Sequence, residues 1–294
     1  MTTKLNWMRL PEEYTKGKFL ILPIAYEKDV TYGKGAAKGA EEIIKASEHI
    51  EYYDEQFDCE PFLEGIELAE IITAENPEEM IEKVTTSLEK QQDKFIVGLG
   101  GDHAVTIGLV KGQEKLSDIQ NQEFSVIQFD AHADFRDSWN NSSLNHACVA
   151  KQISKKHDLA LIGIRSMDID EKKQIELHNQ EEQYKVHLIK AYDYSLEKLK
   201  EILPQLKKRI YITIDVDAFD PSFIRNTGTP EPGGLSWYDM IEALKLIFQE
   251  KEVIGADITE FAPDENKEYQ SEAYALAKLA YKIMALKKVF NLIN

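Results

Sequence analysis

The chain alternates short apolar runs with longer amphipathic runs, and this alternation restricts its fold more than any other feature. The short runs have strand character and lie at residues 19–23, 95–99, 125–129, 159–164, 187–189, 210–214 and 253–256. The longer runs have helical periodicity and lie at residues 37–47, 77–91, 105–116, 168–178, 196–206, 237–248 and 272–290. Strands that alternate with helices predict a mostly parallel sheet with helices on both faces, a three-layer α/β/α sandwich.

The organisation of the chain indicates one domain over residues 1–294. A length of 294 residues suits a single α/β domain, and the sequence has no Pro/Ser-rich linker, internal repeat or low-complexity tract. Ser195 and Ser236 directly precede two of the helical runs, so we expect them to be the N-cap residues of those helices.

The composition limits the partners and the cellular location. With 35 basic and 52 acidic residues the net charge is −17, which argues against a nucleic acid partner. An acidic surface modestly favours cationic ligands, although a well-solvated surface is the simpler explanation. Cys59 and Cys148 form no metal-binding motif and hardly a disulfide framework. No apolar stretch of about 18 residues is present, so we expect a cytoplasmic protein without a membrane span.

The sequence Asp-Ala-His-Ala-Asp follows the apolar run 125–129 and predicts a metal site. Strand periodicity would place Asp130, His132 and Asp134 on one face, where two carboxylates repel each other unless a cation lies between them. A calcium-binding EF-hand loop is excluded, because Phe135 stands where glycine is needed and Asn141 where glutamate is needed.

Two further segments follow strand-like runs and add candidate ligands. Asp215 and Asp217, in Asp-Val-Asp, repeat the same pattern after residues 210–214. His103 follows a glycine-rich turn that begins like a dinucleotide fingerprint, but the third glycine of that fingerprint would fall at position 103. Ligands of parallel α/β sheets bind beyond the carboxyl ends of the strands, where all these residues are expected. Asp220, before Pro221, is expected to form a structural turn.

The sequence alone does not determine the roles of two other residues. His146 follows a polar loop and is either a structural histidine at a helix start or a proton shuttle. Glu260 ends a strand-like run and would be an ordinary loop acid without its context. The loop at residues 227–234 is rich in Gly and Pro, and rigid loops of this kind often shape a pocket.

In their order along the chain, these motifs resemble the ureohydrolase family, the arginases, agmatinases and their relatives, over roughly residues 18 to 265. The resemblance implies an arginase-like α/β fold and two Mn²⁺ ions per chain, which activate water for attack on a guanidinium carbon. It implies that His146 is the proton shuttle, that Glu260 holds the guanidinium group, and that Asp134 assists proton transfer. The implied metal ligands are His103, Asp130, His132, Asp134, Asp215 and Asp217, which as carboxylates and imidazoles suit Mn²⁺.

The resemblance is greatest to agmatinases, which implies cleavage of agmatine to putrescine and urea in polyamine biosynthesis. Residues 30–36 and the Thr-Pro-Glu-Pro-Gly-Gly-Leu sequence carry this likeness. The loop at residues 136–145 does not determine the chemistry of the substrate's tail. Arg136 could pair with a carboxylate, and Trp139 could form an apolar wall for a polyamine-like tail. Aminopropylagmatine, guanidinobutyrate, arginine and formimidoylglutamate are therefore alternative substrates.

Two interpretations from other classes compete with a dinuclear hydrolase. A mononuclear zinc deacetylase on a related α/β fold would leave His103 and the second carboxylates without a role. A non-catalytic polyamine-binding relative would be favoured by a degraded ligand set, whereas all six ligands are present. For the assembly, the family implies a homotrimer or homohexamer.

Overall fold

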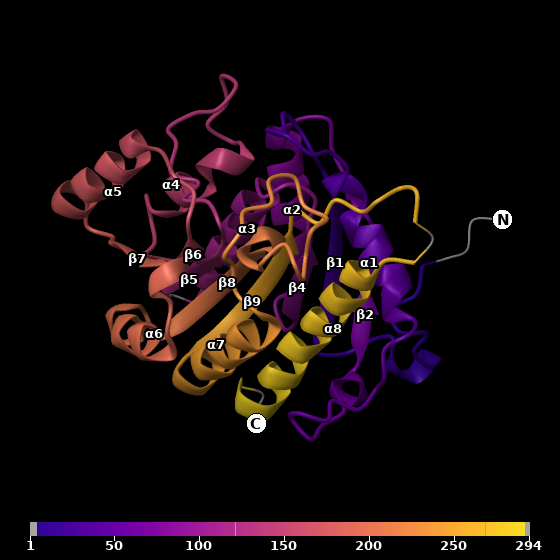
Figure 1. Cartoon of the computed structure of the whole chain (residues 1–294). Coiled ribbons are helices and arrows are strands. Elements are labelled where there is room, and N and C mark those ends of the chain that lie inside the picture. Colours follow the sequence, from indigo (N-terminus) through magenta and orange to yellow (C-terminus); the bar gives the residue numbers. More distant parts are fainter. Residues whose placement is uncertain (1–4, 121, 268, 292–294) are drawn as a thin grey trace.

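The computed structural model describes residues 5–120, 122–267 and 269–291, in which one parallel sheet forms the middle layer (Figure 1). Every strand pair in this sheet is parallel. From one edge to the other the strands are β2 (Ile66–Leu68), β1 (Phe19–Ala25), β4 (Phe95–Leu99), β9 (Glu252–Thr259), β8 (Arg209–Asp215), β5 (Phe124–Phe129), β6 (Leu159–Ile164) and β7 (Val186–Lys190), and β3 (Ile72–Thr73) also pairs with β1.

Helices cover both faces of the sheet, which confirms the predicted three-layer α/β/α fold. One core lies under α1 (Gly39–Ser47), α6 (Leu196–Ile202), α7 (Trp237–Glu250) and α8 (Ser271–Leu286); Figure 1 shows α7 and α8 in front of the sheet. The other core lies under α2 (Pro77–Glu89), α3 (Val105–Gln120), α4 (Val149–Ile153) and α5 (Ile169–Glu181). Successive strand residues alternate between the two cores, as Phe19 and Leu20 do in β1.

The predicted elements are all present, with differences at short or irregular segments. The run 196–206 is α6 followed by a 3₁₀ turn, Leu203–Gln205, because Pro204 cannot supply the amide that a continuing helix needs. The run 272–290 is α8 and then a π-helical turn, Lys287–Asn291. The sequence did not predict β2, β3 or α4, nor the 3₁₀ turns Glu12–Tyr14, Ala36–Lys38, Pro61–Glu64, His146–Cys148, Ala191–Asp193 and Val216–Ala218.

Helix starts follow the expected chemistry. Ser195 accepts a hydrogen bond from the Lys198 amide, and Ser236 accepts one from the Asp239 amide in a reciprocal capping box, so both N-cap predictions are confirmed. Across the described ranges, no helix has the length and apolar character that a bilayer crossing requires.

The strand order brings four segments that are distant in sequence to one place. After β4 and α3 the chain enters β5, but β5 does not pair with β4, since β9 and β8 lie between them. The carboxyl ends of β4, β9, β8 and β5 therefore form a continuous edge at the point where the strand order reverses, which is the usual ligand-binding position of such sheets.

Candidate metal centre and its pocket

His103 reaches the middle of this edge through a turn that only glycine permits. A Cβ atom at Gly101 would lie 1.8 Å from the carbonyl oxygen of Tyr26, so no larger residue fits between β4 and the end of β1. The Gly101 carbonyl accepts a hydrogen bond from the Glu260 amide at 2.7 Å. The turn after β4 is thereby fixed to the segments that follow β1 and β9.

The carboxylate segments turn sharply instead of continuing as strands. Asp130 accepts a hydrogen bond from the amide of His132 at 2.6 Å, and Asp134 has a left-handed backbone with φ of +48°. Asp217 lies in the 3₁₀ turn Val216–Ala218, and its carboxylate accepts the Ala131 amide at 3.0 Å. The predicted convergence of these residues is correct, but local turns and not strand alternation produce it.

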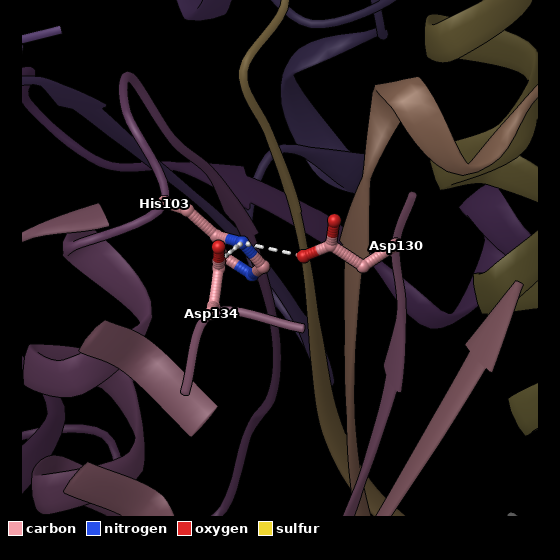
Figure 2. Close-up of side chains that lie close together, drawn as sticks. All are labelled: His103, Asp130 and Asp134. Carbon is pink, nitrogen blue, oxygen red and sulfur yellow. Dashed lines mark ion pairs between the residues drawn. The ribbon is translucent and has the colours of Figure 1, made fainter. Parts of the chain in front are cut away.

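The six side chains form two groups that share one carboxylate. His103 Nδ1 lies 3.1 Å from Asp130 Oδ2 and 3.1 Å from Asp134 Oδ2, and Figure 2 shows its ring between these carboxylates. On the other side, His132 Nδ1 lies 2.9 Å from Asp217 Oδ2 and 3.7 Å from Asp130 Oδ1. Because the two oxygens of Asp130 face different groups, this carboxylate belongs to both groups of candidate ligands.

Asp215 completes the first group. Its Oδ2 lies 3.4 Å from His103 Nδ1, and its Oδ1 accepts the amide of Asp217 at 2.9 Å. The structure thus brings together all six residues that the sequence suggested as metal ligands, although their role as ligands stays a prediction.

A buried hydrogen-bond network fixes the tautomer of His103. The Thr213 hydroxyl donates to the carboxylate of Asp257 at 2.7 Å, so only a lone pair remains to face His103 Nε2 at 3.0 Å. Tyr211 and Thr106 also donate to Asp257. His103 Nε2 therefore carries the proton, and Nδ1 is buried without a hydrogen-bond partner among three carboxylates. This is the arrangement expected of a metal ligand.

The charges at the centre also call for cations. Asp130, Asp134, Asp215 and Asp217 are all buried, and within the described residues no lysine or arginine forms an ion pair with them. Burial and the neighbouring carboxylate of Asp130 raise the pKa of Asp134 to about 7. Four carboxylates balance two dications, and a set of carboxylate and imidazole ligands suits a metal of intermediate hardness. The residues fit a dinuclear centre.

The centre lies in a pocket of about 440 Å³. His146 Nε2 lies 3.0 Å from the Thr31 hydroxyl, and burial together with His103 and His132 lowers the pKa of His146 to about 4. Glu260 has a φ of +66° and accepts the His103 amide at 2.7 Å through Oε1. Both residues line the pocket together with His103, His132, Asp134 and Asp215, and neither belongs to the two groups of candidate ligands.

Arg136 does not project freely into the pocket. Its guanidinium group pairs with Asp168 at 2.7 Å, lies 3.7 Å from Glu171, and stacks 4.9 Å from the centre of the Trp139 ring. Asp220 forms the predicted structural turn, accepting amide hydrogen bonds from Ser222 and Gly233.

Sequence reasoning did not identify Thr213 and Asp257 behind His103. The sequence signal for each was a polar residue in the middle of a mostly apolar strand. It also did not identify Arg165, whose guanidinium group donates to the carbonyls of Asp217 and Glu231, each at 2.7 Å. No local motif marks an arginine whose partners are main-chain carbonyls.

Comparisons with known proteins agree with this geometry. The sequence signature of the Arginase family matches residues 17–286. The chain is 33% identical to an N(1)-aminopropylagmatine ureohydrolase of Synechocystis sp., over 92% of this chain and 89% of the relative. It is 30% identical to an agmatinase of Pyrococcus horikoshii, over 95% of each chain. The solved agmatine ureohydrolase of Thermoplasma volcanium has a TM-score of 0.80 at 25% identity, over 98% of this chain and 94% of that one.

Proposed function

Because the chain belongs to the arginase family, we propose that it is a dinuclear manganese ureohydrolase that releases urea from agmatine or its N1-aminopropyl derivative. The comparisons confirm three predictions from the sequence: the family, the arginase-like fold, and the class of hydrolase acting on guanidino or amidino groups. The observation that carries the proposal is the pair of ligand groups that share Asp130 beside the carboxylate of Glu260.

His103, Asp130, Asp134 and Asp215 would hold one Mn²⁺, and Asp130, His132 and Asp217 the other. The bound ions would supply a hydroxide equivalent near neutral pH for attack on the guanidinium carbon. The remaining steps fall to the protein. Glu260, held by the His103 amide, would orient the guanidinium group through a charge-assisted pair.

Proton transfer would use two residues of the pocket. His146 is buried with a lowered pKa and contacts Thr31, so it would be a neutral imidazole that takes up the proton released by the attacking water and passes it to the leaving amine. Asp134 would assist this proton transfer while it remains in the centre.

The pocket favours a substrate with a cationic tail. Among the described residues that line it, Arg136 is the only lysine or arginine, and its charge is already paired with Asp168. A carboxylate-bearing substrate such as arginine, guanidinobutyrate or formimidoylglutamate would have to displace that pair. Agmatine was the substrate predicted from the sequence, and the relative in Synechocystis supports aminopropylagmatine about equally.

We also propose the domain organisation, the location and the oligomeric state of the protein. Residues 1–294 would form one ureohydrolase domain in a cytoplasmic homotrimer or homohexamer. A non-catalytic polyamine-binding protein would retain the acidic pocket but would not need paired ligand groups around a shared carboxylate.

Urea release tests the proposal. The Mn²⁺-loaded protein is incubated with agmatine, aminopropylagmatine, arginine and guanidinobutyrate, and urea is measured. We expect turnover of agmatine or aminopropylagmatine, or both, and at least about 100-fold less for the carboxylate-bearing compounds. Glu260→Gln should abolish most of this activity while leaving the bound metal unchanged. Efficient arginine cleavage, or no urea from any compound, would overturn the assignment.

A further inference from the structure

The carboxylates that line the outer pocket differ in their hydrogen-bond and ion-pair partners. Asp168 pairs with Arg136 through Oδ2 and accepts the amides of Asp170 and Glu171 through Oδ1. Glu171 accepts the Phe135 and Asp168 amides with its two oxygens. Both carboxylates therefore have structural partners that a ligand would need to replace.

Glu231 is the exception on this wall. Its carboxylate lies 3.8 Å from His132 Nε2, which is beyond hydrogen-bonding distance, and within the described part of the chain no group donates a hydrogen bond to it. The side chain keeps 35% of its surface exposed, and it lines the pocket that contains the metal centre. Its negative charge is thus available to a ligand.

The loop that carries Glu231 is held firmly. Arg165 donates to the Glu231 carbonyl from Nη2 at 2.7 Å and to the Pro232 carbonyl from Nε at 3.0 Å. The same guanidinium group donates to the carbonyl of Asp217, so the loop is tied to a candidate metal ligand. Prolines on both sides of Glu231 restrict the backbone further. A carboxylate on such a support is preorganised for binding.

The position of Glu231 suits the tail of the proposed substrate. Glu260, which accepts the His103 amide, would bind the guanidinium end of the substrate. Glu231 lies beside Nε2 of His132, and Nδ1 of the same ring faces Asp217 in the candidate metal centre. A chain of four methylenes, built from bonds of about 1.5 Å, spans about 6–7 Å when extended. Glu260 and Glu231 line the same pocket, so a guanidinium group held at Glu260 leaves the tail nitrogen free to extend along the pocket toward Glu231.

We propose that Glu231 binds the amine nitrogen that lies four methylenes from the guanidinium group, an inference that rests on the proposed function. In agmatine this nitrogen is the terminal ammonium, and in aminopropylagmatine it is the internal secondary ammonium. One carboxylate therefore serves both substrates, and the aminopropyl extension continues beyond it toward the pocket opening. Glu231 is a specificity-determining residue and takes no part in bond cleavage.

A different role for Glu231 is to accept the Nε2 proton of His132 and so orient that candidate ligand. The two roles predict different behaviour of Glu231→Gln. Loss of an orienting residue would weaken metal binding and lower turnover of every substrate. Loss of a tail-binding residue would affect only substrates with an amine at the right position.

The experiment compares agmatine with n-pentylguanidine, in which a methyl group replaces the ammonium. For Glu231→Gln we expect kcat/KM on agmatine to fall by about 10-fold or more, the value on n-pentylguanidine to change by less than about 3-fold, and the Mn²⁺ content to stay constant. Glu250→Gln, an equal change of charge at the far end of α7, should leave both values unchanged. Equal losses on both substrates, or no loss on agmatine, would overturn the proposal.

Equilibrium binding separates this inference from the proposed function. Titration calorimetry with 1,4-diaminobutane, the expected product, should show about 10-fold weaker binding to Glu231→Gln than to the wild type. If the wild type cleaves no guanidine, the proposed function fails, and the calorimetric comparison still decides whether Glu231 binds an aliphatic amine. Equal affinity of the two proteins would refute that role.

Discussion

Replacing Thr213 by valine tests whether the protein orients His103 as a metal ligand. Thr213 lies in β8 with its hydroxyl between His103 Nε2 at 3.0 Å and Asp257 Oδ1 at 2.7 Å. Valine fills nearly the same volume but offers no lone pair and no proton. The His103 Nε2 proton then has no acceptor, while Asp257 keeps its hydrogen bonds from Tyr211 and Thr106.

The size of the effect follows from these contacts. A buried donor without a partner costs about 1–3 kcal/mol, and Asp257 loses one of three donors, so unfolding of the metal-free protein should become easier by about 2–4 kcal/mol. Loss of the group that orients a metal ligand lowers metal affinity by about 10–100-fold. Thr213→Ser keeps the hydroxyl and should bind Mn²⁺ within about 3-fold of the wild type.

Two measurements check this prediction. Chemical denaturation of the metal-free proteins gives the change in the free energy of unfolding, and Mn²⁺ titration gives the affinity. If Thr213→Val binds Mn²⁺ as tightly as Thr213→Ser, then Thr213 does not set the tautomer and orientation of His103, and the reasoning is wrong.

Other predictions address the scaffold and the charge of the centre. Lys282→Met breaks the buried pair of Lys282 with Asp54, whose two oxygens lie 3.0 Å from Nζ, and should cost about 3–5 kcal/mol in denaturation. Lys278→Met, on the same helix but at an exposed ion pair, should cost less than about 1 kcal/mol; equal costs would contradict this. Gly101→Ala should abolish Mn²⁺ binding, since its Cβ would overlap the Tyr26 carbonyl; normal binding in calorimetry would refute the close approach. In the metal-free protein, burial alone would lower the pKa values of His103 and His132, but the carboxylates beside each ring outweigh burial and raise both pKa values, that of His132 to about 12. Mn²⁺ must displace these protons, so calorimetry in buffers of different ionisation enthalpy should show proton release and affinity should increase with pH; binding without proton release would contradict this.

The sheet was predictable because strands of a parallel sheet bury both faces and read as continuous apolar runs. All five residues of β4 are buried, as are all six of β5. The short edge strands β2 and β3 were missed because two or three residues give no periodicity. The five-residue helix α4 was missed for the same reason.

The candidate ligands were predictable because charged residues directly after buried strands are costly without a function. Their exact arrangement was not, because it depends on turns such as the left-handed backbone of Asp134. Thr213 and Asp257 lie within strands, where a single polar residue has many explanations. Glu231 was visible only as part of a rigid Pro- and Gly-rich loop, since its exposure toward the pocket is a tertiary property.

The two ligand groups that share Asp130 predict that two metal ions bind next to each other in this protein. Electron paramagnetic resonance of the protein, titrated with Mn²⁺ and combined with metal analysis, can detect such a pair. We expect two Mn²⁺ per chain and, at full loading, the spectrum of an exchange-coupled pair, which Asp130→Ala should abolish. One Mn²⁺ per chain, or the six-line signal of isolated ions at full loading, would contradict the dinuclear centre.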